Sequence, residues 1–430
     1  MDFKASSRVL VLSLVTITAG AARANTWQKL TPFESPNGSC KGLEFFSDTN
    51  GFAYCDSKIF QTTDGMRWTK TADVPMMFGG VLLPAGMAFL SPQVAVAFGD
   101  AYTAATALVE KSVDGGKTWM PKPAAGVTGS VTMASATFLD ATNGLYYGNN
   151  GMTAFLASTK DGGDTWTPVA LPWAPTQARV LVAAMADAKT WLVETVALGG
   201  VTQTDLQRTA DSGATWTPVT TTAGFQLIQF VDKNHGFGYL GSAKELWEST
   251  DGGATFTNIF KGTEPLIDYN MNVMRWKDGM NGLLGGNVIL RTKDGGQTFA
   301  ADTAPADWRP NDSQPPVSGF AWPGPSAYAY TAANVKIIVR DPAAGGASTG
   351  GTTGAGGTTG AAGTTGAAGT TGAAGTTGAA GTTGAAGTMS GGGGGGGCAV
   401  AGTPFAARGL APILLAIVAA VTRRRRARRR

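Results

Sequence analysis

The feature that most constrains this chain is a short motif, here called a box, that recurs six times. A box has a Ser or Thr, an Asp two residues later, small residues and then an aromatic residue. The copies are TTDGMRW (62–68), SVDGGKTW (112–119), TKDGGDTW (159–166), TADSGATW (209–216), STDGGATF (249–256) and TKDGGQTF (292–299). Because the copies are 40 to 50 residues apart, they predict a repeat architecture.

Each box has similar neighbours, which indicate what kind of unit repeats. A small turn and an apolar run precede several boxes, as in NGFAY (50–54), NGLYY (143–147), HGFGY (235–239) and NGLLG (281–285). Short runs of this kind between Asn, Gly and Asp are typical of strands and hairpins. A unit of this length holds about four antiparallel strands, which predicts the blade of a β-propeller and an all-β fold.

The box itself is suited to a tight turn between strands. An Asp carboxylate can accept hydrogen bonds from nearby backbone N–H groups, and the glycines adopt positive φ at little cost. The aromatic ring can then be buried between neighbouring units. We therefore interpret the box aspartates as structural residues: Asp64, Asp114, Asp161, Asp211, Asp251 and Asp294.

These boxes resemble the Asp-box, or BNR, repeat of β-propellers, and the resemblance covers about residues 26–341. Five boxes match the pattern in full. The first is one residue shorter and lacks the second Gly and the Thr. The repeats are most similar to propellers of the photosystem II stability and assembly-factor type, and this resemblance implies an exported propeller without known enzymatic activity.

The two ends of the repeat region predict how the ring closes. TWQKLTP (26–32) is similar to the segments that follow a box, and residues 319–341 form a turn and three more strands with no box after them. The N-terminal strand is therefore expected to complete a seventh blade, which would remove exposed sheet edges. Six blades with a decorated end is the alternative.

The N-terminus has the pattern of a secretory signal peptide. Lys4 and Arg8 precede an apolar run, and Ala22-Arg23-Ala24 provides a cleavage site between small residues. We assign residues 1–24 to the signal peptide and residues 25–342 to the propeller.

Two segments follow the propeller. Residues 343–397 are almost entirely Gly, Ala and Thr, a composition that predicts a disordered spacer.

Residues 398–430 contain Cys398, a short apolar segment and seven terminal arginines. This tail resembles the sorting tails of myxobacterial surface proteins, which implies processing by a myxosortase-like enzyme with Cys398 as the processing or lipid-attachment point. An ordinary transmembrane tail anchor is the alternative, and both predict an exported protein at the cell surface, associated with the outer membrane through the tail or a lipid.

The net charge argues against nucleic-acid binding. The whole chain is formally +4, but residues 1–24 hold three basic and one acidic residue, and eight arginines follow Cys398. The remaining chain has 22 basic and 28 acidic residues, a net charge of −6. An acidic propeller gives no support to a nucleic-acid partner.

Cysteine and histidine usage bears on redox chemistry and metals. Cys40 and Cys55 flank the first predicted hairpin, so a disulfide is expected in an oxidising compartment, with two buried thiols as the alternative. Two cysteines and one histidine cannot complete a closed zinc site, and no cofactor is expected.

The sequence offers little for catalysis, so we expect no enzyme. His235, the single histidine, takes the place of Asn in the NG turns, which excludes Ser/His/Asp and Cys/His arrangements. A sialidase-like or glucanase-like glycoside hydrolase is the alternative. A sialidase needs three arginines around the substrate carboxylate, and the only candidates here are Arg179, Arg275 and Arg309. The Phe-Arg-Ile-Pro motif of sialidases does not occur.

A binding role for a protein or glycan partner fits better. In propellers of this type, the loops between blades and the loops between second and third strands share one face. Aromatic residues beside charges on that face are typical binding anchors. The candidates are Trp173, Tyr269, Trp308 and Arg309, whose alternative role is to cover blade edges or the central channel.

Overall fold

The computed structural model contains strands and turns but no helix in the residues that it describes. These are residues 27–30, 40–74, 85–99, 109–127, 131–198, 204–220, 224–261, 271–286, 288–302, 317–331 and 338–341. The predicted signal peptide, spacer and sorting tail with Cys398 lie outside them, as do Tyr269, Trp308 and Arg309. Within the described part, no helix is long and apolar enough to cross a membrane.

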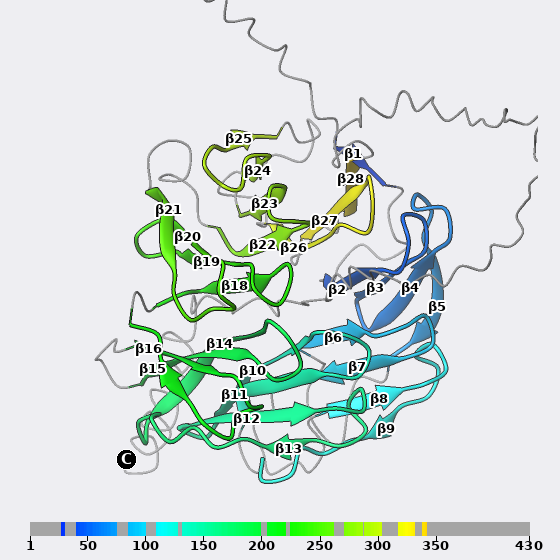
Figure 1. Cartoon of the computed structure of the whole chain (residues 1–430). Helices are drawn as coiled ribbons and strands as arrows, with labels where there is room; N and C mark the ends of the chain where they lie inside the picture. The colour runs from blue at the N-terminus through cyan, green and yellow to red at the C-terminus, as the bar shows by residue number, and fades with distance from the viewer. Residues whose placement is uncertain are drawn as a thin grey trace, which may run out of the picture.

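Six four-stranded antiparallel sheets are each built from one continuous stretch of chain (Figure 1). Blade 1 contains β2 (Cys40–Phe45), β3 (Gly51–Cys55), β4 (Lys58–Thr62) and β5 (Thr69–Asp73). Blade 2 contains β6 (Gly86–Phe89), β7 (Ala95–Phe98), β8 (Val109–Ser112) and β9 (Met120–Pro121). Blade 3 contains β10 (Val131–Phe138), β11 (Gly144–Asn150), β12 (Thr153–Thr159) and β13 (Thr167–Pro168).

The second half of the chain continues the pattern. Blade 4 contains β14 (Ala178–Met185), β15 (Trp191–Ala197), β16 (Thr204–Thr209) and β17 (Thr217–Pro218). Blade 5 contains β18 (Leu227–Phe230), β19 (Gly236–Leu240), β20 (Glu245–Ser249) and β21 (Thr257–Lys261). Blade 6 contains β22 (Val273–Trp276), β23 (Gly282–Gly285), β24 (Ile289–Thr292) and β25 (Ala300–Ala301). The predicted all-β propeller is therefore confirmed.

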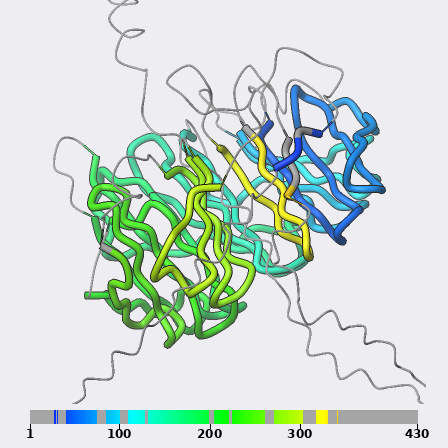
Figure 2. Tube along the Cα trace, turned by 90° about the horizontal axis from the view of Figure 1, so that it is seen from above, coloured from blue at the N-terminus to red at the C-terminus, as the bar shows by residue number. Residues whose placement is uncertain are grey.

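A further four-stranded sheet, here called the end sheet, combines the two ends of the repeat region. β1 (Gln28–Lys29) pairs antiparallel with β28 (Ile338–Asp341), with Gln28 opposite Arg340. β27 (Ala327–Thr331) and β26 (Val317–Ala321) complete the sheet. Figure 2 shows the end sheet, in yellow with β1 in dark blue, between blade 1 and blade 6.

Each blade is a meander, and this order decides which loops share a face. Successive strands are antiparallel neighbours, so the first strands lie toward the centre and contact the first strands of the next blades (Figure 1). The turn after the first strand and the box after the third strand consequently lie on one face, here called the box face. The loops between second and third strands and between blades lie on the opposite face.

Among the described residues, the hydrophobic core is divided into seven clusters, one at each contact between neighbouring sheets. Cluster members always come from two sheets, as where Val96 and Phe98 of blade 2 meet Phe138 and Tyr146 of blade 3. The aromatic residue of every box packs into the cluster shared with the preceding sheet; these residues are Trp68, Trp119, Trp166, Trp216, Phe256 and Phe299. Burial of these rings therefore holds the sheets against one another.

The expected disulfide is present in blade 1. Cys40 on β2 and Cys55 on β3 are directly opposite each other, and their sulfur atoms are bonded. Both residues are buried in the cluster between blade 1 and the end sheet. The bond therefore fixes the first hairpin beside the place where the two ends of the propeller meet.

Candidate functional site

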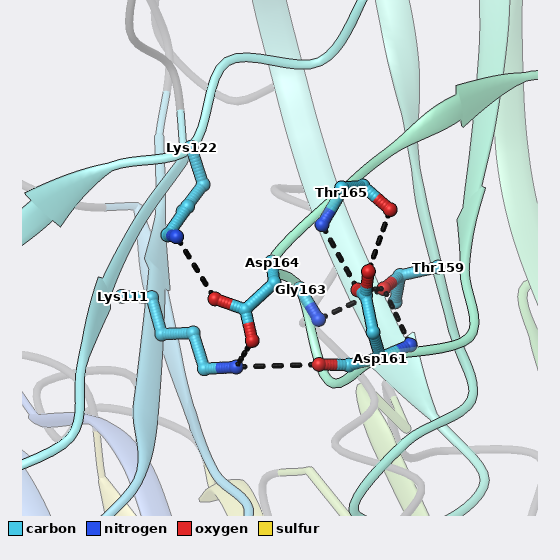
Figure 3. A network of polar contacts seen from close by, with 7 residues as sticks. All are labelled: Lys111, Lys122, Thr159, Asp161, Gly163, Asp164 and Thr165. Carbon is cyan, nitrogen blue, oxygen red and sulfur yellow. Dashed lines mark hydrogen bonds and ion pairs between the residues drawn. The ribbon is translucent and has the colours of Figure 1, made fainter.

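The box aspartates are engaged within their own turns. In box 159–166, the Thr159 hydroxyl donates to Asp161 Oδ1 at 2.8 Å and the Thr165 N–H to the same oxygen at 2.9 Å. The Thr165 hydroxyl donates to Asp161 Oδ2 at 2.6 Å (Figure 3). Boxes 112–119, 209–216, 249–256 and 292–299 repeat this arrangement. Both carboxylate oxygens are thus occupied in bracing the turn.

These hydrogen bonds also set the ionisation of the box carboxyls. The Thr215 hydroxyl, with the Thr215 N–H and the Thr209 hydroxyl, lowers the pKa of Asp211 to about 2. Burial alone would raise the pKa of Asp161, but the hydrogen bonds from Thr165 and Thr159 outweigh it and lower this pKa to about 2 as well. A carboxyl of this kind stays ionised at neutral pH and is unsuited to act as a general acid.

The second glycine of a box sits against the preceding blade. Gly163 has φ of 87°, and a Cβ there would lie 3.3 Å from Val96 of blade 2 and 3.4 Å from the Trp166 ring. The first box differs in this respect, since Met66 stands at the corresponding position and packs in the cluster that blade 1 shares with the end sheet. In the first box, which lacks the Thr before the aromatic residue, the Asp64 carboxylate accepts hydrogen bonds from the backbone N–H groups of Met66 and Arg67.

A second set of turn-bracing residues was missed by the sequence reasoning. In the turn after the first strand, Asp140 Oδ1 accepts hydrogen bonds from the N–H groups of Thr142 and Asn143 at 2.7 and 2.8 Å. Asp187, Asp232 and Asp278 do the same in blades 4, 5 and 6. The signal was an Asp four residues before the second strand of the blade, but Ser47 and Ser91 replace it in blades 1 and 2.

The residue before the Ser or Thr of a box is basic in three blades, and in each of these it contacts the next sheet. Lys111 pairs with Asp164 of blade 3 at 2.5 Å, and Lys122 pairs with the same carboxylate at 2.9 Å (Figure 3). Arg208 Nε donates to the carbonyl oxygen of Gly252 in blade 5 at 2.8 Å. These side chains fill the outer part of the contact between two blades.

Arg291, at the same position in blade 6, joins that blade to the end sheet. Its side chain is 3% exposed, and the guanidinium pairs with Asp302 and, at 2.7 Å, with Asp341 of β28. The Trp27 indole N–H, just before β1, donates to Asp302 Oδ2 at 2.9 Å. This buried cluster connects residues from both ends of the propeller.

A groove lies at the contact between blades 3 and 4. Its volume is about 430 Å³, and it opens between β13 and box 209–216. The lining residues are Ser158, Lys160, Thr165, Thr167, Pro168, Val169, Ala170, Ser212, Gly213 and Ala214. The lining therefore combines hydroxyl-bearing residues, small apolar residues and one lysine.

Of the four residues predicted to bind a partner, the structure places Trp173. It lies in the loop from blade 3 to blade 4, is half-buried, and packs 4.7 Å from the Trp216 ring, measured between centroids. Its indole N–H donates to Thr195 Oγ1 at 3.2 Å. Trp173 thus packs across two blades, which matches the alternative role of covering a blade edge, and its part in binding stays a prediction.

The residues weighed for catalysis are dispersed. His235 lies in the first turn of blade 5, with Nε2 at 2.7 Å from Glu248 Oε1. Arg179 and Arg275 lie on β14 and β22, the first strands of two blades that are not neighbours. Within the described residues, no group of three or more His, Cys, Asp or Glu could hold a metal ion.

Two buried glutamates have raised pKa values. Burial raises the pKa of Glu110, on β8, to about 7. Burial likewise raises the pKa of Glu194, on β15, to about 7, although its carboxylate oxygens accept hydrogen bonds from the N–H groups of Gly224 at 2.6 Å and Phe225 at 3.0 Å. The loop from blade 4 to blade 5 is thereby tied to β15.

The fold and its braced turns define a β-propeller of four-stranded blades, and the comparisons with solved structures agree. A structure described as YCF48 bound to D1 peptide has a TM-score of 0.52 and 15% identity, covering 77% of this chain and 99% of that one. YCF48 from Cyanidioschyzon merolae has a TM-score of 0.50 and 13% identity, covering 74% and 98%. The WD40 β-propeller domain of Doa1 has a TM-score of 0.50 and 10% identity, covering 74% and 97%.

At these identities the likeness shows the fold alone. The sequence matches no family model, and no curated protein is significantly similar to it.

Proposed function

We propose that this protein is an exported, surface-tethered β-propeller that binds a protein partner and does not catalyse a reaction. The observation that carries the proposal is the engagement of the recurring carboxylates. Each box aspartate accepts hydrogen bonds from its own turn, so the conspicuous acidic residues brace the fold and are not free to act on a substrate.

The similar structures support a protein ligand over a glycan. For the structure described as bound to a D1 peptide, the comparison covers 99% of that chain, so the shared part is the whole propeller and not one blade. The box motif supports placing the chain among Asp-box propellers of the photosystem II assembly-factor type. For the ring, we propose seven blades, with the end sheet as the seventh, because its clusters join it to blade 1 and to blade 6.

The proposed location depends on the two ends of the sequence. A cleaved signal peptide would export the propeller, and a tail beginning at Cys398 would hold it at the cell surface through a spacer of Gly, Ala and Thr. Mass spectrometry of the mature protein tests this directly. The proposal predicts Asn25 at the N-terminus and a C-terminus that lacks the arginines; surface material that keeps the complete tail would contradict processing.

A binding protein and a glycoside hydrolase differ in what they do to a ligand. The purified full chain is applied to a peptide array and a glycan array, and is assayed in parallel with chromogenic glycosides. The proposal predicts saturable binding to peptides without turnover. Glycoside turnover that disappears when a single loop carboxylate is replaced would overturn it in favour of the hydrolase, and a glycan ligand without turnover would correct the partner class.

A further inference from the structure

The contact between blades 2 and 3 shows how the outer part of a blade contact is normally filled. Lys111 and Lys122 of blade 2 both pair with Asp164 of blade 3 (Figure 3). Lys111 is buried, and its ammonium group also donates to the carbonyl oxygen of Asp161 at 3.3 Å. Three charged side chains therefore occupy the space between the third strand of one blade and the box of the next.

At the contact between blades 3 and 4, uncharged residues occupy the positions equivalent to these three charged side chains. Alignment of the boxes places Ser158 where blade 2 has Lys111, Val169 where it has Lys122, and Ala214 where blade 3 has Asp164. All three smaller residues line the groove of about 430 Å³. The groove is thus the space that an ion cluster fills one blade earlier. The next contact is filled again, by Arg208.

The charge of the groove indicates which ligand it would accept. Lys160 is the one charged residue among those that line the groove, and it is exposed, with no ion-pair partner among the described residues. The hydroxyl groups of Ser158 and Thr167 also line the groove. A cation beside hydroxyl donors complements a carboxylate, since both can donate hydrogen bonds to it.

The position of the groove favours a peptide over a sugar. One wall includes β13, the outermost strand of blade 3, which pairs with β12 on one side only. Pro168 has no N–H and the Val169 N–H already donates to the Leu156 carbonyl oxygen, so this edge offers a carbonyl acceptor to an extended peptide and no N–H donor; a side chain of that peptide can then enter the adjacent groove. The apolar lining residues Pro168, Val169 and Ala170 are small and offer no aromatic ring for a sugar to stack on.

We propose that the groove between β13 and box 209–216 binds an acidic side chain of an extended segment of a partner protein, with Lys160 as the residue that pairs with its carboxylate. This inference rests on the proposed protein-binding function and names a site for it. The segment would lie beside β13, where the carboxylate provides specificity and the Pro168 carbonyl oxygen can accept one backbone hydrogen bond.

The probes are two synthetic peptides, acetyl-TVEVEVT-amide and its glutamine counterpart acetyl-TVQVQVT-amide, together with trigalacturonate. Each is titrated into the purified full chain and its Kd measured by NMR. The proposal predicts that the glutamate peptide binds about tenfold more tightly than the glutamine peptide. Trigalacturonate bound more tightly than the glutamate peptide would overturn the peptide assignment.

Two variants test the position of the site. Lys160→Glu should weaken binding of the glutamate peptide about tenfold. Lys293→Glu is the matched control, because Lys293 occupies the same box position in blade 6, beside the contact that Arg291 fills. It should change the Kd less than twofold. Equal losses in both variants would show a general charge effect and would overturn the proposal.

A third variant fills the groove without removing Lys160. The double substitution Ser158→Lys with Ala214→Asp restores the ion pair found between blades 2 and 3. It should fold with an unchanged or higher Tm and lose binding about tenfold. If it binds the peptide as tightly as the unmodified protein, the groove is not the site; peptide binding that persists in every variant would leave the proposed function standing while this site falls.

Discussion

The carboxylate of Asp48 accepts a hydrogen bond from the backbone N–H of Ser326 at 3.1 Å, although 278 residues separate them. The Ser326 hydroxyl donates to the other carboxylate oxygen at 3.2 Å, and the Tyr328 hydroxyl donates to the Asp48 carbonyl at 2.8 Å. The Phe45 and Tyr328 rings stack beside them. Blade 1 and the end sheet are therefore joined by polar contacts as well as by their shared core.

Replacing Asp48 tests this junction. Asp48→Ala removes both carboxylate acceptors and should lower the free energy of unfolding by about 1–2 kcal/mol. Hydrogen exchange measured by mass spectrometry should become faster in β26 and β27 but stay unchanged in blade 4. Uniform acceleration across all blades would contradict a local role at the junction.

Arg291 is expected to matter more than its counterpart Arg208. Arg291→Met leaves the carboxylates of Asp302 and Asp341 buried without their cation, so the free energy of unfolding should fall by about 3–5 kcal/mol. Arg208→Met is the matched control, because Arg208 donates to a single carbonyl oxygen, and it should cost about 1 kcal/mol. Urea denaturation measures both, and equal losses would contradict a special role for the buried cluster.

The disulfide should contribute substantially to stability. Its cysteines are 15 residues apart, and the entropy of closing a loop of this size corresponds to about 3 kcal/mol. The double substitution Cys40→Ala with Cys55→Ala should lower the urea midpoint, and a reducing agent should do the same to the unmodified protein. A midpoint that neither treatment changes would contradict this expectation.

Glu110 should make stability depend on pH. Because burial raises its pKa in the folded protein to about 7, from 4.5, the folded state keeps a proton that the unfolded state has lost. Its contribution is complete below about pH 4.5 and is lost as the pH rises through about 7. Glu110→Gln should therefore be about 1–2 kcal/mol more stable than the unmodified protein at pH 8 but not at pH 4. A difference independent of pH between the two proteins would contradict this assignment.

The sequence predicts the blades well because the box is a local device. An Asp, a hydroxyl residue and glycines at fixed spacing are sufficient to make the turn, and the aromatic residue that follows must be buried somewhere. The first-turn braces such as Asp140 escaped notice because serine replaces aspartate in two blades and breaks the period. An Asp or Ser stands four residues before the second strand in each of blades 1 to 6, and aligning the blades could have found it.

The groove and the binding residues are harder to predict. Ser158, Val169 and Ala214 are unremarkable alone, and their meaning depends on which residues oppose them across two blades. Trp173 has the composition of a binding anchor, yet its ring packs on Trp216. Sequence shows that an aromatic residue lies in a loop, but only the packing of the neighbouring blade decides how much of the ring is exposed.

The most direct test of the account is a paired measurement on one box aspartate that is distant in sequence from the groove. Asp251→Ala removes the acceptor of the Thr255 N–H and of the Ser249 and Thr255 hydroxyls, and it should lower the free energy of unfolding by about 1–2 kcal/mol. The folded variant should bind the glutamate peptide with an unchanged Kd. Full stability combined with lost binding, or with the loss of a hydrolytic activity, would show that the box carboxylates act on a ligand and would contradict the account.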